Sequence, residues 1–224
     1  MAKKLLSLIC TISLVLTLGA CSSSVGESSN AETTSQTSAD TDIEETTSQT
    51  MSSSQESTDT TATDTGTGVL VVVFSVTGHT KDIAAKIAAI EGADIYEIVP
   101  AVPYTDNDIN YGDDSSRTSI EQNDPTIRPE IGSEKIDISK YSKIYVGYPI
   151  WWGQEPRIMD TFVETYDFGN ATVIPFCTSG SSGIGNSGTN LAANAGSGNW
   201  LEGKRFASGT SEDEVKAWIE GMNI

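Results

Sequence analysis

Residues 68–224 are predicted to form an α/β domain, a doubly wound parallel sheet with helices on both faces. Three observations support this fold class. Continuous apolar runs, typical of strands covered on both faces, alternate along the chain with segments whose apolar residues recur at helical spacing. Strands separated by helices in this way form right-handed βαβ units. Finally, loops of glycine and hydroxyl residues follow several of the strands, at the edge where such sheets bind ligands.

Four strands are predicted from the apolar runs. Residues 69–74 form an unbroken run, VLVVVF, and the next strands cover residues 94–99, 143–148 and 171–176. A fifth, weaker strand is expected somewhere in residues 200–207. Pro175 cannot donate a hydrogen bond to a neighbouring strand, so we expect it to mark the end of the fourth strand.

Three helices are predicted between and after these strands. The first carries Asp82 in its first turn, where a carboxylate suits the helix dipole. The second starts at Pro156, and the third opens with a capping box formed by Ser211 and Glu214. Their apolar stripes consist of Ile83, Ile87 and Ile90, then Met159, Phe162, Val163 and Tyr166, then Val215, Trp218, Ile219 and Met222.

The chain begins with the features of a secretory signal. Lys3 and Lys4 precede a mostly apolar stretch, residues 5–18, which is too short for a comfortable membrane span. Leu18-Gly19-Ala20-Cys21 then resembles the lipobox of bacterial lipoproteins. The resemblance implies that residues 1–20 are a signal peptide and that Cys21 carries lipid, which anchors the protein on the extracytoplasmic face of the cell membrane. The alternative is an ordinary signal peptide with a chance cysteine.

Residues 21–67 are predicted to be a disordered tether. After Cys21 they are rich in Ser, Thr and acidic residues and nearly free of large apolar side chains, so they cannot bury enough surface to fold. The 46 residues from 22 to 67 contain nine acidic side chains and no Lys or Arg. As a flexible coil they span about 35–40 Å, long enough to hold a domain clear of a bilayer.

Charge and cysteine content exclude several classes of function. The whole chain has a formal net charge of −18, and residues 68–224 contain 11 basic and 22 acidic side chains, a net charge of −11. Nucleic acid and anionic lipid are therefore not expected as direct partners, and the membrane is contacted only through the lipid. Cys177 has no intramolecular partner once Cys10 is cleaved off and Cys21 is lipidated. It is expected to be a small buried apolar residue, not a nucleophile.

The loop after the first strand contains residues suited to a phosphate. Ser75, Thr77 and Thr80 supply hydroxyls, and Gly78 allows the backbone to approach a ligand at the start of a helix. His79, the only histidine, is expected to contact the phosphate or solvent. No Lys occupies the position that a nucleoside-triphosphate loop requires, which argues against ATP chemistry. Alone, such a motif could be a plain strand-to-helix turn.

Two further loops complete the candidate site. Pro149-Ile150-Trp151-Trp152-Gly153 follows the third strand and offers aromatic surface to a flat ring. The adjacent tryptophans point to opposite sides in extended backbone, so one is expected to stack on the ring and one to pack inward, with a slight preference for Trp152 as the stacking residue. After the fourth strand, Thr178, Ser179, Gly180 and Gly183 offer amides and hydroxyls to a ring's polar edge. Alternatively they form a flexible surface loop.

At these residues the chain resembles the flavodoxin family, especially its compact branch with a Trp-Trp-Gly flavin loop. The resemblance covers nearly all of residues 68–224. Ser75, Thr77, Gly78 and Thr80 match the family's phosphate loop, in which His79 replaces the usual Asn. Residues 149–153 match the first flavin-ring loop, and residues 175–180 with Gly183 match the second. The resemblance implies a five-stranded sheet in the order 2-1-3-4-5 and FMN as the cofactor.

Residues 100–136 are long for a connection within a compact domain. Their acidic residues include an Asp-x-Asp pair at Asp106 and Asp108, but the twelve-residue calcium loop with its terminal Glu is absent, and no metal site is predicted. We expect a partly helical flap beside the flavin, or a surface for a partner.

The function expected from these features is electron transfer by bound FMN, with a redox protein or a small electron acceptor as partner. A net charge of −11, with no basic residue in the three loops, would disfavour the electron-rich reduced flavin. Two alternatives stay open. The same fold could be an NAD(P)H-dependent quinone or nitro reductase, or a non-redox binding lipoprotein that has lost the cofactor.

Overall fold

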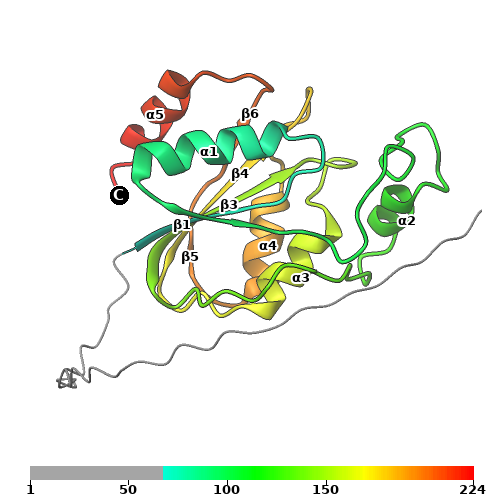
Figure 1. Ribbon diagram of the computed structural model, residues 1–224, viewed down its shortest axis with the longest axis horizontal. Coiled ribbons are helices and arrows are strands. Elements are labelled where there is room, and N and C mark those ends of the chain that lie inside the picture. Colours follow the sequence, from blue (N-terminus) through cyan, green and yellow to red (C-terminus); the bar gives the residue numbers. More distant parts are fainter. Residues whose placement is uncertain (1–67) are drawn as a thin grey trace, which may run out of the picture. The chain divides into compact units, whose positions relative to one another are not determined.

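The computed structural model describes residues 68–224, and the predicted signal peptide, lipidation site and tether lie outside the described residues. The described elements alternate between strand and helix along most of the domain (Figure 1). The strands are β1 (Gly68–Val73), β2 (Asp94–Glu97), β3 (Tyr141–Pro149), β4 (Thr172–Thr178), β5 (Asn199–Trp200) and β6 (Lys204–Phe206). The helices are α1 (His79–Glu91), α2 (Arg117–Asn123), α3 (Arg157–Thr165), α4 (Ser187–Ala195) and α5 (Glu212–Gly221).

The sheet is parallel throughout and has the order β2-β1-β3-β4-β5, which confirms the predicted topology. The buried strand β1 lies between β2 and β3, with Val71 aligned to Ile95 on one side and to Tyr145 on the other. Strand order reverses between β1 and β3. Ligands of doubly wound sheets bind beyond the carboxyl ends of the strands at such a point.

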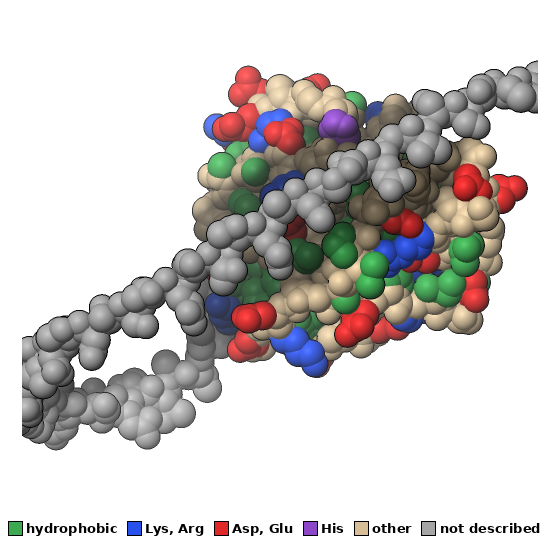
Figure 2. All heavy atoms as spheres, turned by 45° about the vertical axis from the view of Figure 1, so that its right-hand side comes forward, with side chains coloured by type: hydrophobic (Ala, Val, Ile, Leu, Met, Phe, Trp, Pro, Cys, Tyr) green, Lys and Arg blue, Asp and Glu red, His purple; other side chains and the backbone are tan. Residues whose placement is uncertain are grey.

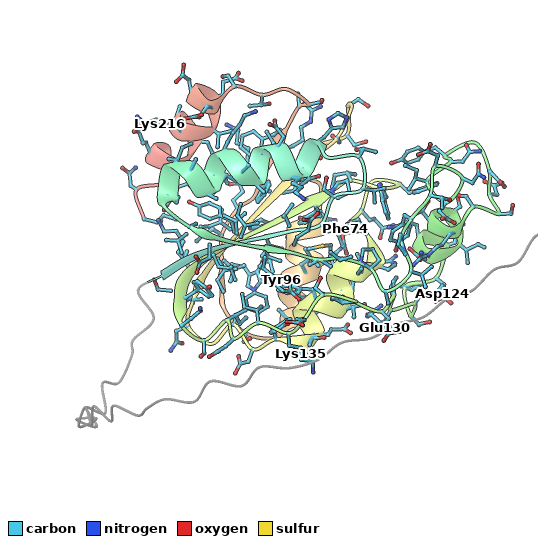
Figure 3. The ribbon with its side chains drawn as sticks, in the orientation of Figure 1. Phe74, Tyr96, Asp124, Glu130, Lys135 and Lys216 are labelled. Carbon is cyan, nitrogen blue, oxygen red and sulfur yellow. The ribbon has the colours of Figure 1, made fainter. Side chains whose placement is uncertain are left out.

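Helices cover both faces of the sheet, α1 and α5 on one and α3 and α4 on the other (Figure 1). Each face has its own apolar core, and alternate residues of β1 contribute to the two. Val71 and Val73 pack beneath α1, while Leu70, Val72 and Phe74 pack on the opposite face. Phe74 lies at the carboxyl end of β1, next to the site described below (Figure 3).

The fifth strand is split into β5 and β6, both of which pair with β4. Residues 201–203 leave the sheet between them. The prediction that Pro175 ends β4 was wrong, since Pro175 lies in the middle of that strand. The break between β5 and β6 explains how the strand accommodates it. The carbonyl of Val173 accepts from the amide of Leu201, so the odd-numbered residues of β4 face β5 and β6. The missing N–H of Pro175 therefore faces the break and deprives no partner.

Helix α4 was not predicted from the sequence. Its nine residues, SGTNLAANA, are mostly small or polar, and only Ser187 and Leu191 are buried. A stripe of one large apolar residue is too short to produce a recognisable helical period. The predicted capping box of Ser211 and Glu214 is present at the start of α5, as is Pro156 at the N-cap of α3. Within residues 68–224, no helix is long and apolar enough to cross a membrane.

Candidate functional site

A cavity of about 510 Å³ lies at the carboxyl ends of the strands, where the three predicted loops meet. Its size falls within the range of small-molecule sites. The loop after β1, the loop after β3 and the loop after β4 all contribute, together with the segment after β6 and two residues of the 100–136 connection. The lining residues are Ser75, Val76, Thr77, His79, Thr80, Ile109, Tyr111, Pro149, Ile150, Trp151, Thr178, Ser179, Gly180, Ala207 and Ser208.

The first loop ends at the amino terminus of α1. Gly78 occupies the N-cap with a φ of 86°, a left-handed conformation that glycine adopts without steric cost. No side chain caps this helix end, so the amides of the first turn remain available to a ligand. His79 is exposed (Figure 2), and its Nδ1 lies 3.0 Å from the Ser208 hydroxyl. The arrangement can hold an anion with neutral donors and the positive end of the helix dipole.

A buried hydrogen bond joins the first loop to the third. The hydroxyl oxygens of Thr80 and Thr178 lie 2.7 Å apart, and both side chains are buried. A further bond runs from the Ile150 amide to the Thr178 carbonyl, at 2.9 Å. The residue that ends β4 therefore connects all three loops.

The second loop is a tight turn from Trp151 to Gln154. Their backbones exchange two hydrogen bonds, at 3.0 and 2.9 Å, and the central residues Trp152 and Gly153 have φ values of 48° and 80°. Positive φ at both central positions is the mark of a type I′ turn. Glycine tolerates this conformation, whereas a tryptophan rarely adopts it.

The turn sends the two tryptophans in different directions. Trp151 is 4% exposed and packs edge-on against Phe74 and Tyr104, with ring centroids 5.5 and 5.2 Å away. It still borders the cavity. Trp152 is half-buried and lies against Tyr111, with centroids 4.5 Å apart and an angle of 34° between the rings. Trp152, which the sequence slightly favoured as the stacking residue, does not border the cavity but packs against Tyr111, which does.

Arg205 of β6 holds the third loop in place. Its guanidinium donates to the carbonyls of Ser179 and Gly180, at 2.6 and 2.9 Å, and to the Ser179 hydroxyl at 3.1 Å. The sequence showed no basic residue within the three loops, but the fold brings this cation to one of them. The negative field expected at the site is therefore opposed by a positive charge close by.

The connection from residue 100 to residue 136 forms the expected partly helical flap, with α2 as its helix (Figure 1). Within the flap, Tyr104 is joined to α2: it donates to Glu121 Oε2 at 2.8 Å, and the guanidinium of Arg117 lies 3.9 Å from the centre of the Tyr104 ring. Burial and the neighbouring Glu121 carboxylate raise the pKa of Tyr104. The flap reaches the cavity through Ile109 and Tyr111.

Cys177 is fully buried, and burial raises its pKa to about 12. A thiol that stays protonated in this way is a poor nucleophile, in agreement with the sequence prediction. No group of three or more His, Cys, Asp or Glu side chains in residues 68–224 is arranged to hold a metal ion.

The structure brings most of the predicted site residues together. Of the predicted set, Gly78, Trp152, Gly153 and Gly183 do not line the cavity, although the first three shape the loops that do. Sequence reasoning missed Val76, Ile109, Tyr111, Ala207 and Ser208. Ala207 and Ser208 follow the last strand, so the rule that ligands bind beyond the carboxyl ends of parallel strands could have identified them. Nothing in the sequence near Tyr111 marks it as part of the site.

Comparison with known proteins agrees with this geometry. Residues 68–222 match the family model described as flavodoxin. A candidate flavoprotein from Bacteroides eggerthii is 43% identical over 70% of this chain and 98% of its own, with a TM-score of 0.66. Another from Bacteroides uniformis is 42% identical over 69% and 99%, also at 0.66.

A flavoprotein from Lactobacillus acidophilus, solved in complex with FMN, shares the fold at 22% identity, covering 68% of this chain and 99% of its own with a TM-score of 0.51. A search of the curated proteins gave no match. The family match spans more than two thirds of the chain and coincides with the sheet, the loops and the cavity described above. The chain belongs to the flavodoxin family.

Proposed function

We propose that residues 68–224 bind FMN and that the protein carries electrons while anchored through Cys21 outside the cytoplasmic membrane. The observation that carries this proposal is the shared cavity. It joins an uncapped helix N-terminus with nearby hydroxyls to the buried aromatic ring of Trp151. A phosphorylated ligand with a flat ring needs both features, the helix N-terminus for its phosphate and the aromatic side chain for its ring.

The residues present fit FMN. The Ser75 and Thr77 hydroxyls and the first amides of α1 would hold the phosphate, which needs no basic side chain at a helix N-terminus. Trp151 would lie against the ring, and the backbone of Ser179 and Gly180 would border its polar edge. When bound, the flavin supplies the redox chemistry, and the protein sets its position and reduction potential.

The charge of the domain supports electron transfer at a low reduction potential. Acidic side chains are spread over the face of the domain that Figure 2 shows, and residues 68–224 have a formal net charge of −11. A negatively charged environment disfavours added negative charge on a bound flavin ring and therefore lowers its reduction potential. Arg205 acts in the opposite direction because its guanidinium lies against the third loop.

An anaerobic redox titration of the purified protein, followed by its absorption spectrum, tests the proposal. We expect a yellow protein that is reduced in separated one-electron steps and oxidises NADH and NADPH slowly. A colourless protein that does not take up added FMN would indicate a non-redox binding lipoprotein. Rapid NAD(P)H oxidation with a quinone acceptor would indicate a reductase.

The phosphate loop has its own test. Thr77 is exposed, borders the cavity and makes no hydrogen bond within the described structure, so Thr77→Ala removes only a donor to the ligand. FMN binding should weaken about 10- to 150-fold, because hydrogen bonds to charged groups contribute about 1.5–3 kcal/mol, whereas riboflavin binding should not change. Thr189→Ala, on exposed α4 surface, is the matched control. Equal losses for both ligands would contradict the assignment.

The anchor is tested by Cys21→Ser, which removes the proposed thiol for lipid attachment. The variant should leave the membrane fraction and appear in soluble form. Continued membrane association that only detergent reverses would contradict lipidation at this residue.

A further inference from the structure

Tyr111 is a large aromatic side chain displayed at the edge of the cavity. It follows Asn110 in a tight turn, in which the Asp113 amide donates to the Asn110 carbonyl at 3.2 Å and the Gly112 amide donates to Asn110 Oδ1 at 2.9 Å. These bonds fix the backbone on both sides of Tyr111. The side chain is nevertheless 59% exposed, although it borders a cavity lined largely by apolar surface.

The Tyr111 ring is held in position by Trp152. Their centroids are 4.5 Å apart with a tilt of 34°, close enough for an offset stack. The backbone of Trp152 has a φ of 48° at this place, which is unfavourable for a bulky residue. Unfavourable backbone conformations concentrate at ligand sites, where the surrounding structure maintains them. Here the conformation places an aromatic support directly behind Tyr111.

Trp151 and Tyr111 are the two large aromatic side chains of the cavity wall, and they come from different parts of the chain. Trp151 is supplied by the loop after β3 and packs on Phe74 and Tyr104. The third loop, residues 178–183, contains only Thr, Ser and Gly and can offer no ring. A second aromatic contact for a flat ligand must therefore come from the flap.

We propose that Tyr111 is a binding residue for the flavin ring, which it covers from the flap with Trp152 as its support. The inference rests on the proposed FMN function and deepens it by making the flap part of the cofactor site. Affinity for the ring then depends on a segment outside the three loops. The flap is itself anchored to the site by Tyr104, which packs on Trp151.

Titrations of FMN and riboflavin into the Tyr111→Ala, Tyr111→Leu and Tyr111→Phe proteins test this role. Tyr111→Ala and Tyr111→Leu should weaken both ligands by the same factor, about 3- to 10-fold, because the ring is common to both. Tyr111→Phe keeps the aromatic face and should bind within about 2-fold of the parent protein. Ile120→Ala, at an exposed flap position away from the cavity, should bind as the parent does.

A measurement on the apoprotein tests whether Trp152 supports the Tyr111 ring. In the apoprotein, near-ultraviolet circular dichroism should lose the same band in Tyr111→Ala and in Trp152→Ala, because the two rings form one pair. Unchanged affinity in Tyr111→Ala and Tyr111→Leu, with a parent protein that binds FMN, would overturn the inference and leave the proposed function intact. A parent protein that fails to bind FMN would overturn both.

Discussion

The side-chain oxygens of Thr80 and Thr178 lie 2.7 Å apart in a buried hydrogen bond between the first turn of α1 and the end of β4. Ninety-eight positions separate the two residues in the sequence. The bond holds the phosphate-side loop against the loop after β4. Of the two hydroxyl protons, one is used in this bond and the other is left for a ligand. The pair is therefore both a structural contact and a part of the cavity wall.

A double-mutant cycle should detect this bond in the apoprotein. Thr80→Val or Thr178→Val alone leaves the partner hydroxyl buried without a hydrogen bond, which costs about 1–3 kcal/mol of unfolding free energy. The double variant should lose less than the sum of the single variants, because no unpaired hydroxyl remains. Urea unfolding measures the three values. Strict additivity would mean that the two hydroxyls do not interact in solution.

Arg205→Gln should loosen the third loop and lower the reduction potential of bound flavin. The substitution removes a cation and the hydrogen bonds to Ser179 and Gly180. The loss of one nearby positive charge corresponds to a decrease of roughly 20–60 mV. Arg205→Lys keeps the charge and should restore most of the potential without restoring the loop.

Lys204→Gln is the matched control for this effect. Lys204 precedes Arg205 in β6 and carries the same charge, but its ammonium group lies over the Phe206 ring, 5.4 Å from its centre. An equal change of potential in both variants would show that overall charge is responsible, and not the position of Arg205. Hydrogen exchange of residues 178–183 should increase only in the Arg205 variants.

Gly147→Ala should strongly destabilise the domain. A Cβ at Gly147 would lie 2.1 Å from Cζ of Phe176, whose side chain is fully buried on the neighbouring strand β4. The ring has no space to retreat, so we expect a loss of about 3 kcal/mol or more in unfolding free energy. Phe176→Leu in the same chain should recover part of it. Gly221→Ala, where an added methyl meets nothing within 4 Å, should leave the melting temperature nearly unchanged.

High pH should unfold the domain through its buried acids. Burial raises the pKa of Cys177 from 9.0 to about 12 and that of Tyr96 from 10.0 to about 12, and it raises the pKa of Tyr148 as well. At a pH between a group's ordinary pKa and its raised pKa in the folded protein, the unfolded chain has released a proton that the folded protein retains. Stability is thus complete below pH 9 and falls as the pH rises, by up to about 1.4 kcal/mol per pH unit for each group.

Denaturant titrations from pH 7 to pH 11 would measure this loss, and Cys177→Ala would remove the part due to the thiol. The slope between pH 9 and pH 10 should flatten in that variant, because tyrosines of the unfolded chain ionise only near pH 10. A stability that does not change up to pH 11 would contradict the assignment of these groups as buried and protonated.

Much of the fold was predictable because its signals are local. The apolar run of β1, the capping box of α5 and the order of strand and helix patterns can each be recognised within a short window. The prediction for Pro175 was wrong because the cost of its missing N–H depends on the neighbouring strand. That strand breaks at residues 201–203 and needs no hydrogen-bond donor there. Helix α4 lacked a signal because its buried face contains one large residue, Leu191.

The candidate site was predictable where its residues follow strands and unpredictable elsewhere. Thr77, Trp151 and Ser179 lie at carboxyl ends of strands, which meet at one edge in any parallel sheet. Tyr111 and Arg205 reach the site through tertiary packing alone, Tyr111 from an insertion and Arg205 from a short strand. No short-range pattern encodes either contact.

The two tryptophans of the second loop should respond differently to truncation. Trp151→Ala opens a cavity beneath Phe74 and Tyr104 and should cost about 3–5 kcal/mol of unfolding free energy. Trp152→Ala removes a half-buried ring from a turn and should cost less than about 1 kcal/mol, whereas Trp152→Gly should recover part of that loss because glycine adopts a φ of 48° freely. Both Trp152 variants should still weaken FMN and riboflavin equally, because Tyr111 loses its support. Thermal melts with flavin titrations measure both effects. A Trp152→Ala protein with a large loss of stability and normal flavin affinity would reverse the roles assigned to the two residues.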